Sequence, residues 1–225
     1  MRKLICLSAV IAVHWAFGQN VIWNKVVKSR EGAEKELYRI NPEISKAEYL
    51  GEVEVQGFST DDAKVFGLIY KKAKEIGANA FSWRPYEAID GKVQKFDAWN
   101  YRISLYYLPT DQIPEEKGLL YIYAPPAQDQ SISLNKENIK FKERTYTVRK
   151  LTDGETYTLS TRKLLGSSVK FKADVKQPSQ YLQLQAFQVQ SAPYGEAGIN
   201  LKSGDIIRLE RSFADFLSLV YTQLK

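Results

Sequence analysis

The chain contains one cysteine, one histidine and one methionine, and all three lie within its first 18 residues. Histidine is the usual general base near neutral pH, and cysteine supplies thiolate nucleophiles and soft metal ligands. The residues after Gly18 therefore cannot form a Ser-His-Asp or Cys-His catalytic set, a Cys/His zinc site, a thiol redox centre or a haem site held by His or Cys. Disulfides are excluded as well. We expect no cofactor and no enzymatic activity, and a fold that depends on core packing.

Long apolar runs are also missing, apart from Leu4 to Phe17. This run follows two basic residues and ends at Ala16 and Gly18, which is the order of a cleavable signal peptide over residues 1–18. It is too short to span a bilayer, which takes about 20 residues. A lipid anchor on Cys6 is the alternative, but Cys6 precedes most of the apolar run. We expect cleavage near Gly18 and a periplasmic or secreted protein that does not span a membrane.

Neither sign of charge dominates the sequence. Removal of the signal peptide would lower the number of basic residues from 32 to 30, against 26 acidic residues, which leaves a net charge near +4. Lysine and arginine are interleaved with aspartate and glutamate, as in residues 71–75 (KKAKE). Nucleic-acid binders instead concentrate basic residues on one face. We therefore expect an ordinary solvated surface and no nucleic-acid partner.

Hydrophobic periodicity predicts a β-α-β-β module over residues 49–108, after an N-terminal arm at residues 19–48 with a weak strand pattern over residues 20–28. Residues 49–57 alternate like a strand. Ser59 to Asp62 supply a helix cap, and apolar residues then recur at helical spacing until Gly77 closes the helix. Residues 78–83 predict the second strand, Asp90-Gly91 signals a hairpin turn, and residues 92–108 predict the returning strand.

Part of this module resembles a known type of protein. Residues 50–53 (LGEV), the capped helix and residues 74–80 (KEIGANA) look like the "GANA" modules of small bacterial envelope proteins, such as the stress-sensor lipoproteins and the YbjQ-like proteins. The resemblance covers residues 49–108 and implies an α+β module in an envelope protein. The chain lacks the disulfide and anchoring cysteines of the stress sensors, so signalling by their route is not implied.

A linker at residues 109–118 precedes a second region, residues 119–225, in which short alternating segments predict an antiparallel β-sandwich or small barrel. At the C-terminus, Ser212 and Asp215 predict a capped helix, although Leu217 to Tyr221 also alternates like a strand. The expected fold class is therefore α+β. The predicted strands are residues 119–124, 131–134, 138–141, 144–150, 155–160, 168–174, 181–189 and 204–210, and the predicted helix face is Phe213, Phe216, Leu217, Val220, Tyr221 and Leu224.

Aromatic side chains gather around the predicted hairpin and are the candidate ligand-binding residues. Trp83, Tyr86, Trp99 and Tyr101 could stack on a sugar ring or anchor a protein interface. A two-residue turn would place Trp83 opposite Ala98 and Trp99 on the other face, whereas one bulge residue would bring both Trp side chains together. The same rings could instead fill the core between the sheet and its helix.

Acidic residues offer the remaining route to chemistry. Glu52 and Glu54 alternate with two valines, which places both carboxylates on one solvated face of a strand. Asp61-Asp62 fits first-turn charge at a helix start better than a metal site. Three functions stay open: a non-catalytic accessory that binds an envelope protein, a carbohydrate or peptidoglycan binder, and a glycosidase with two acids about 5 to 10 Å apart in a cleft. The missing catalytic residue types favour the first.

Overall fold

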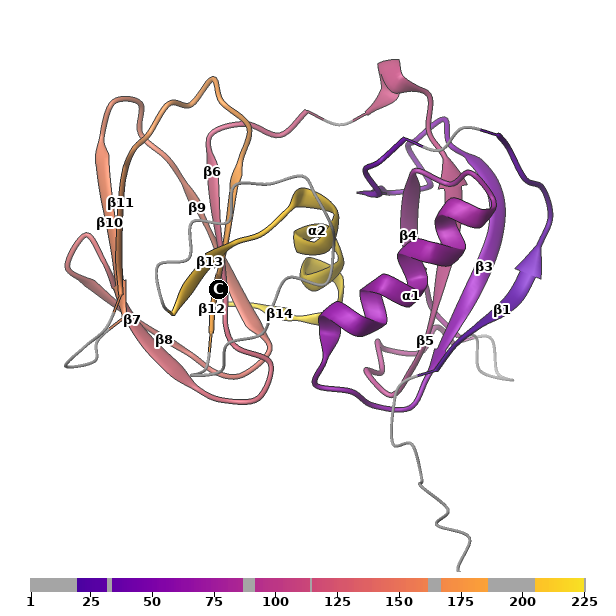
Figure 1. Cartoon of the computed structure of the whole chain (residues 1–225), viewed down its shortest axis with the longest axis horizontal. Helices are drawn as coiled ribbons and strands as arrows, with labels where there is room; N and C mark the ends of the chain where they lie inside the picture. The colour runs from indigo at the N-terminus through magenta and orange to yellow at the C-terminus, as the bar shows by residue number, and fades with distance from the viewer. Residues whose placement is uncertain are drawn as a thin grey trace, which may run out of the picture.

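Three β-sheets and two α-helices form a mixed, mostly β structure in the computed structural model of Figure 1, which describes residues 20–31, 34–86, 92–113, 115–161, 167–185 and 205–224. The expected signal peptide and the Asp90-Gly91 turn lie outside the described residues. Within these ranges no helix has the length and apolar character needed to cross a membrane.

The N-terminal sheet has the strand order β1-β3-β5-β4-β2. Its neighbours pair antiparallel, except β2 and β4, which are parallel. The elements β3, α1, β4 and β5 follow one another in the expected order, but the residues expected to form an arm add β1 and β2 to the same sheet. The bounds are β1 (Asn20–Val26), β2 (Tyr38–Arg39), β3 (Glu48–Gln56), β4 (Ala80–Arg84) and β5 (Asn100–Tyr107).

Helix α1 (Asp62–Glu75) covers one face of this sheet (Figure 1). The Asp61 carboxylate accepts a hydrogen bond from the backbone N–H of Lys64 at 3.0 Å, so a cap lies within the predicted stretch, and Asp61, expected as first-turn charge, is the capping residue. Buried side chains recur every three or four residues and face the strands. After the helix, Gly77 has φ +73°, and a β-carbon there would lie 2.3 Å from the carbonyl oxygen of Arg30. Only glycine fits this turn.

The second half is a sandwich of two sheets with a shared apolar core. The inner sheet has the order β13-β12-β6-β9-β14 and the outer sheet the order β11-β10-β7-β8, and most of their strand pairs are antiparallel. Each of the eight predicted segments overlaps one of the strands β6 to β13. Their bounds are β6 (Leu119–Tyr123), β7 (Gln130–Leu134), β8 (Glu137–Phe141), β9 (Thr145–Lys150), β10 (Thr156–Thr161), β11 (Ser168–Lys172), β12 (Gln180–Leu184), β13 (Ile206–Arg208) and β14 (Thr222–Gln223), and a 3-10 turn, η1 (Thr110–Gln112), precedes them.

The C-terminal segment contains both a helix and a strand. Helix α2 (Arg211–Val220) ends before Tyr221, and β14 then pairs in parallel with β9. Two details of the prediction are wrong. Ser212 does not cap the helix, because its Oγ accepts a hydrogen bond from the backbone N–H of Leu37 at 2.9 Å, and Leu224 lies beyond the helix and packs against the sandwich core.

Helix α2 lies between the sandwich and the N-terminal sheet with its helix (Figure 1). Its Phe216 ring centroid is 5.4 Å from that of Phe66 in α1. On its other side, the Tyr123 hydroxyl of β6 donates a hydrogen bond to the carbonyl oxygen of Ala214 at 3.0 Å. One apolar cluster therefore runs from the N-terminal sheet through both helices to the inner sandwich sheet.

The strand predicted over residues 92–108 is too long, because β5 begins only at Asn100. Its neighbour β4 ends at Arg84, which pairs with Arg102, so residues before Asn100 have little of β4 to pair with. The alternation itself is confirmed, since Tyr101, Ile103 and Leu105 are all buried.

Candidate functional site

The face of the N-terminal sheet that points away from α1 is lined by polar side chains from three strands. Directly paired residues of neighbouring antiparallel strands lie on the same face. Glu52 pairs with Ser104, which pairs with Ser82, and Glu54 pairs with Arg102, which pairs with Arg84. We call this surface the polar face. The residues between them, such as Val53 and Ile103, point to the core.

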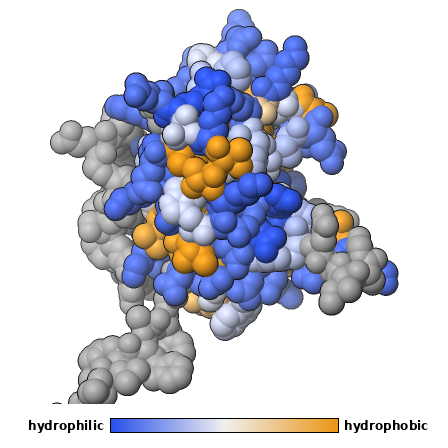
Figure 2. Space-filling model, turned by 90° about the vertical axis from the view of Figure 1, so that its right-hand side faces the viewer, coloured by the Kyte–Doolittle hydropathy of each residue, from blue (hydrophilic) through white to orange (hydrophobic). Residues whose placement is uncertain are grey.

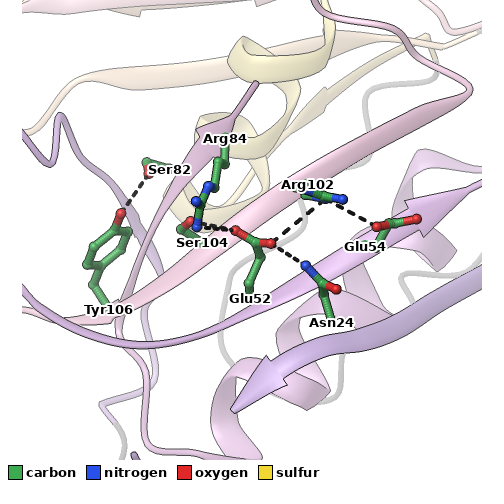
Figure 3. Close-up of polar contacts among 8 residues, drawn as sticks. All are labelled: Asn24, Glu52, Glu54, Ser82, Arg84, Arg102, Ser104 and Tyr106. Carbon is green, nitrogen blue, oxygen red and sulfur yellow. Dashed lines mark hydrogen bonds and ion pairs between the residues drawn. The ribbon is translucent and has the colours of Figure 1, made fainter. Parts of the chain in front are cut away.

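Glu52 is the centre of a hydrogen-bonded network on the polar face (Figure 3). One carboxylate oxygen accepts from the side-chain amide of Asn24 at 2.5 Å and lies 3.8 Å from Nε of Arg102. The other accepts from Arg84 at 3.1 Å and from the Ser104 hydroxyl at 3.3 Å. Only 2% of the Glu52 residue surface is exposed. The expectation of a solvated carboxylate at this position is therefore wrong, because four side chains cover it.

Glu54 completes the charge balance of the network. Arg102 Nε lies 3.2 Å from one of its oxygens, and the Gln56 amide donates to the other at 2.8 Å. The hydrogen bond from Gln56, together with Arg102, holds the pKa of Glu54 below its ordinary value. Glu52 and Glu54 thus share Arg102, and two carboxylates face two guanidinium groups.

A cleft of about 530 Å³ lies beside this network. The rings of Tyr49 and Tyr106 meet edge to face in its wall, with centroids 5.6 Å apart. The Ser82 hydroxyl donates to the Tyr106 hydroxyl at 3.4 Å (Figure 3). The lining is Asn41, Pro42, Glu43, Tyr49, Ser82, Trp83, Arg84, Pro85, Ser104 and Tyr106. The cleft therefore combines aromatic and proline walls with hydroxyl, amide and guanidinium groups.

Strand β1 forms the opposite edge of the same sheet and has one strand neighbour, β3, within the described residues. Its first four residues pair regularly with β3, and a bulge follows between Trp23 and Lys25. Ile22 and Val26 are 44% and 51% exposed, and Val27 directly after the strand is also exposed. Figure 2 views the side of the molecule where β1 and β3 lie and shows apolar patches within a hydrophilic surface.

The structure does not bring the four predicted ligand-binding aromatics onto one face. Tyr101 is 2% exposed and packs against Phe96 with ring centroids 5.2 Å apart, so a ligand cannot reach its ring. Trp83 pairs with Ile103 on the core face and meets Phe96 edge to face at 5.8 Å. Tyr101 therefore belongs to the N-terminal core, and Trp83 packs against that core.

Tyr86 and Trp99 lie elsewhere. The Arg102 guanidinium sits over the Tyr86 ring at 4.3 Å, which places Tyr86 beside the polar face, and burial raises the pKa of its hydroxyl. Trp99 is 58% exposed and packs on Phe58, with ring centroids 5.1 Å apart. Trp83 lies opposite Ile103 rather than Ala98, so neither register considered for a short hairpin occurs.

A second buried carboxylate joins the two halves of the molecule. Asp62, in the first turn of α1, accepts hydrogen bonds from Arg144 at 2.8 and 3.3 Å and from the Tyr221 hydroxyl at 2.8 Å. Burial raises the pKa of Asp62, while Arg144 and Tyr221 favour the ionised form. The sequence pattern predicted Asp62 as charge at the start of a helix. It did not predict the pairing with Arg144, which lies in the turn before β9.

Among the described residues, no group of three or more Asp, Glu, His or Cys side chains is arranged to hold a metal ion. No protein-family model, curated protein or solved structure matches the chain. The polar face, its cleft and the β1 edge are the candidate functional surfaces.

Proposed function

We propose that this chain is a non-catalytic exported envelope protein that binds another protein by adding a partner strand to β1. The observation that carries this proposal is the open β1 edge with its exposed Ile22 and Val26. An unpaired edge presents backbone N–H and C=O groups, and proteins that do not use such an edge guard it. Strand addition satisfies these groups, and pockets or apolar contacts on alternate residues supply specificity.

The features of β1 that disfavour pairing with another strand lie in its second half. Lys25 and the bulge follow Trp23, whereas residues 20–23 (NVIW) run in regular register with β3. Exposed apolar residues lie on both sides of the bulge. We infer that the first half of β1 receives the partner strand and that Val26 and Val27 extend the apolar contact.

The state of the carboxylates supports binding over a glycosidase. Such an enzyme needs one acid with a raised pKa and a second carboxylate near it in the cleft. Glu52 and Glu54 instead share Arg102, and the pKa of Glu54 is lowered. The carboxyl group of Asp62, whose pKa burial raises, is held by Arg144 and Tyr221 and does not line the cleft.

The proposal gives the two halves different roles. In it, the β3-α1-β4-β5 module with β1 presents the binding surface, and the sandwich supports it through α2. Export rests on the signal-like residues 1–18, and the resemblance of residues 49–108 to modules of envelope proteins agrees with that location.

The test is affinity capture from the native envelope with three forms of the protein. Ile22→Lys/Val26→Lys places charges on the β1 edge, which is how natural edge strands are protected. Ile44→Lys/Val93→Lys changes two apolar residues that are more exposed, at 83% and 65%, and that lie outside β1. A partner that uses β1 is expected to be captured by the wild type and the second variant and at least ten-fold less by the first.

Two results would reject the proposal. One is an identical set of captured proteins with all three forms. The other is loss of capture with both double variants, which would mean that added positive charge, and not the β1 edge, determines the outcome.

A further inference from the structure

The cleft beside the polar face offers hydrogen-bond donors and acceptors in a nearly fixed arrangement. Arg84 is held by the buried Glu52 carboxylate at 3.1 Å, and Ser104 donates to the same carboxylate. Glu52, Ser104 and Arg84 lie on three consecutive strands of the sheet, β3, β5 and β4, where the backbone has little freedom. A ligand that enters the cleft therefore meets groups that have already lost most of their conformational freedom.

The charges of the cleft balance each other. Arg84 is compensated by Glu52, and Arg102 is shared by Glu52 and Glu54. Glu43 adds an exposed carboxylate to the lining. An anionic ligand would meet the Glu43 carboxylate, and a cationic ligand would meet the Arg84 guanidinium. The balance favours a neutral ligand that both donates and accepts hydrogen bonds.

The walls of the cleft add flat apolar surface to these polar groups. Tyr49 and Tyr106 present rings inclined at 69° to each other, and Pro42 and Pro85 are rigid apolar neighbours. A pyranose ring has an apolar C–H face that packs on such surfaces and a rim of hydroxyls that pair with amide, guanidinium and hydroxyl groups. The volume of about 530 Å³ lies within the range of about 300 to 1,000 Å³ that is usual for small-molecule sites.

We propose that this cleft binds a neutral saccharide, with Arg84 and Tyr106 as hydrogen-bonding residues and Tyr49 as part of the apolar wall. The site is separate from the β1 edge, because residues 41–43 and strands β3, β4 and β5 supply its lining and none of the lining residues belongs to β1. It goes beyond protein binding and does not depend on it. Of the four aromatic residues predicted to bind a ligand, Trp83 is in the lining of this cleft, and Tyr86, Trp99 and Tyr101 are not.

A printed array of neutral mono- to tetrasaccharides, with acidic glycans and tripeptides on the same slide, tests the ligand class. We expect binding confined to neutral saccharides. The best array ligand is then titrated by calorimetry into the wild type, Arg84→Met and Tyr106→Phe. Arg84→Met, which keeps most of the side-chain volume, is expected to weaken binding at least ten-fold, and Tyr106→Phe, which removes one hydroxyl, about three-fold or more.

Arg149→Met is the matched control, because Arg149 is also a partly exposed arginine in an ion pair, with Glu137, but lies on the sandwich. It is expected to bind like the wild type. No binding to any neutral saccharide, binding confined to acidic glycans or tripeptides, or an unchanged affinity of Arg84→Met would each overturn the proposal. Ile22→Lys/Val26→Lys should keep saccharide binding, and Arg84→Met should keep protein capture, so failure of one proposal is distinguishable from failure of the other.

Discussion

Glu52 and Asp62 are both buried carboxylates, and each is stabilised by hydrogen bonds and by arginine. A buried charge is tolerated only when hydrogen bonds and an opposite charge replace its lost hydration. Glu52 is paired with arginines at the surface of the polar face, where they remain accessible to a ligand. Asp62 is paired inward with Arg144 and Tyr221, and its network holds α1 against the sandwich.

Among single side chains, we expect the loss of Arg144 to lower the free energy of unfolding most. It binds both oxygens of Asp62, contacts the faces of Phe58 and Tyr221, and has a backbone φ of +52°, which is unusual for a residue with a side chain. Arg144→Ala is expected to lower the free energy of unfolding by about 3 to 5 kcal/mol, because it leaves a buried carboxylate without its cation. Urea denaturation at pH 7 measures the difference.

The control for Arg144 is Arg149→Ala. Arg149 pairs with Glu137 at 2.9 Å, but both side chains are well exposed, and pairs of that kind contribute about 0 to 1 kcal/mol. Equal losses in the two variants would contradict the special role given to the buried pair.

At the scale of elements, residues 77–80 (GANA) form a turn after α1 and a pair of hydrogen bonds between the start of β4 and the end of β5. Gly77 supplies the left-handed turn after α1. The Asn79 side chain donates to the carbonyl oxygen of Leu108 at 2.8 Å and accepts from its N–H at 2.7 Å, which fastens the start of β4 to the end of β5. Asn79 and both flanking alanines are almost fully buried. The motif is thus explained by backbone geometry and hydrogen bonding.

Asn79→Ala removes both of these hydrogen bonds and leaves two buried backbone groups of Leu108 without partners. Each such group costs about 1 to 3 kcal/mol, so we expect a total loss of about 2 to 4 kcal/mol of stability in thermal or urea denaturation. The exposed Asn138 on β8 is the control, and its change to alanine should stay within about 0.5 kcal/mol. A small effect at Asn79 would mean that water replaces the lost side chain.

Helices and strands were predictable from the sequence where the hydrophobic periodicity agreed with the capping and turn residues at their ends. Helix α1 has a capping aspartate, a helical repeat and a closing glycine, and the sandwich strands alternate between turn residues. The β1 strand shows that pattern only weakly and β2 does not show it, and both strands form by pairing with β3 and β4. The covering of Glu52 was not predictable, because Asn24, Arg84 and Arg102 reach it only once the strand order and register are fixed.

At the scale of the whole molecule, helix α2 packs against both halves, and we expect it to couple their unfolding. The sequence suggested a linker at residues 109–118 between two separate units. In the structure, α2 follows the sandwich strand β13 but packs on α1, and the segment after it returns to the sandwich as β14. Unfolding of the sandwich would remove one side of the packing around α2 and expose the apolar surface of α1.

The distribution of tryptophan makes this coupling measurable. Trp23, Trp83 and Trp99 all lie in the N-terminal half, and the fourth tryptophan, Trp15, lies in the expected signal peptide. Leu159 is fully buried in the sandwich core, on the outer sheet and on the side away from α2. Leu159→Ala is expected to cost about 2 to 5 kcal/mol. With coupled halves, its tryptophan-fluorescence midpoint in urea should fall by as much as its circular-dichroism midpoint.

Separate halves would give a different result with the same variant. The circular dichroism, which reports strands of the whole chain, would then move or split, while the tryptophan signal would keep the wild-type midpoint. Leu68→Ala, at an exposed position of α1, is the control and should leave both midpoints in place. Coincident shifts in Leu159→Ala would mean that a partner bound at β1 is felt in the sandwich as well, because anything that binds only the folded state stabilises every part that unfolds with it.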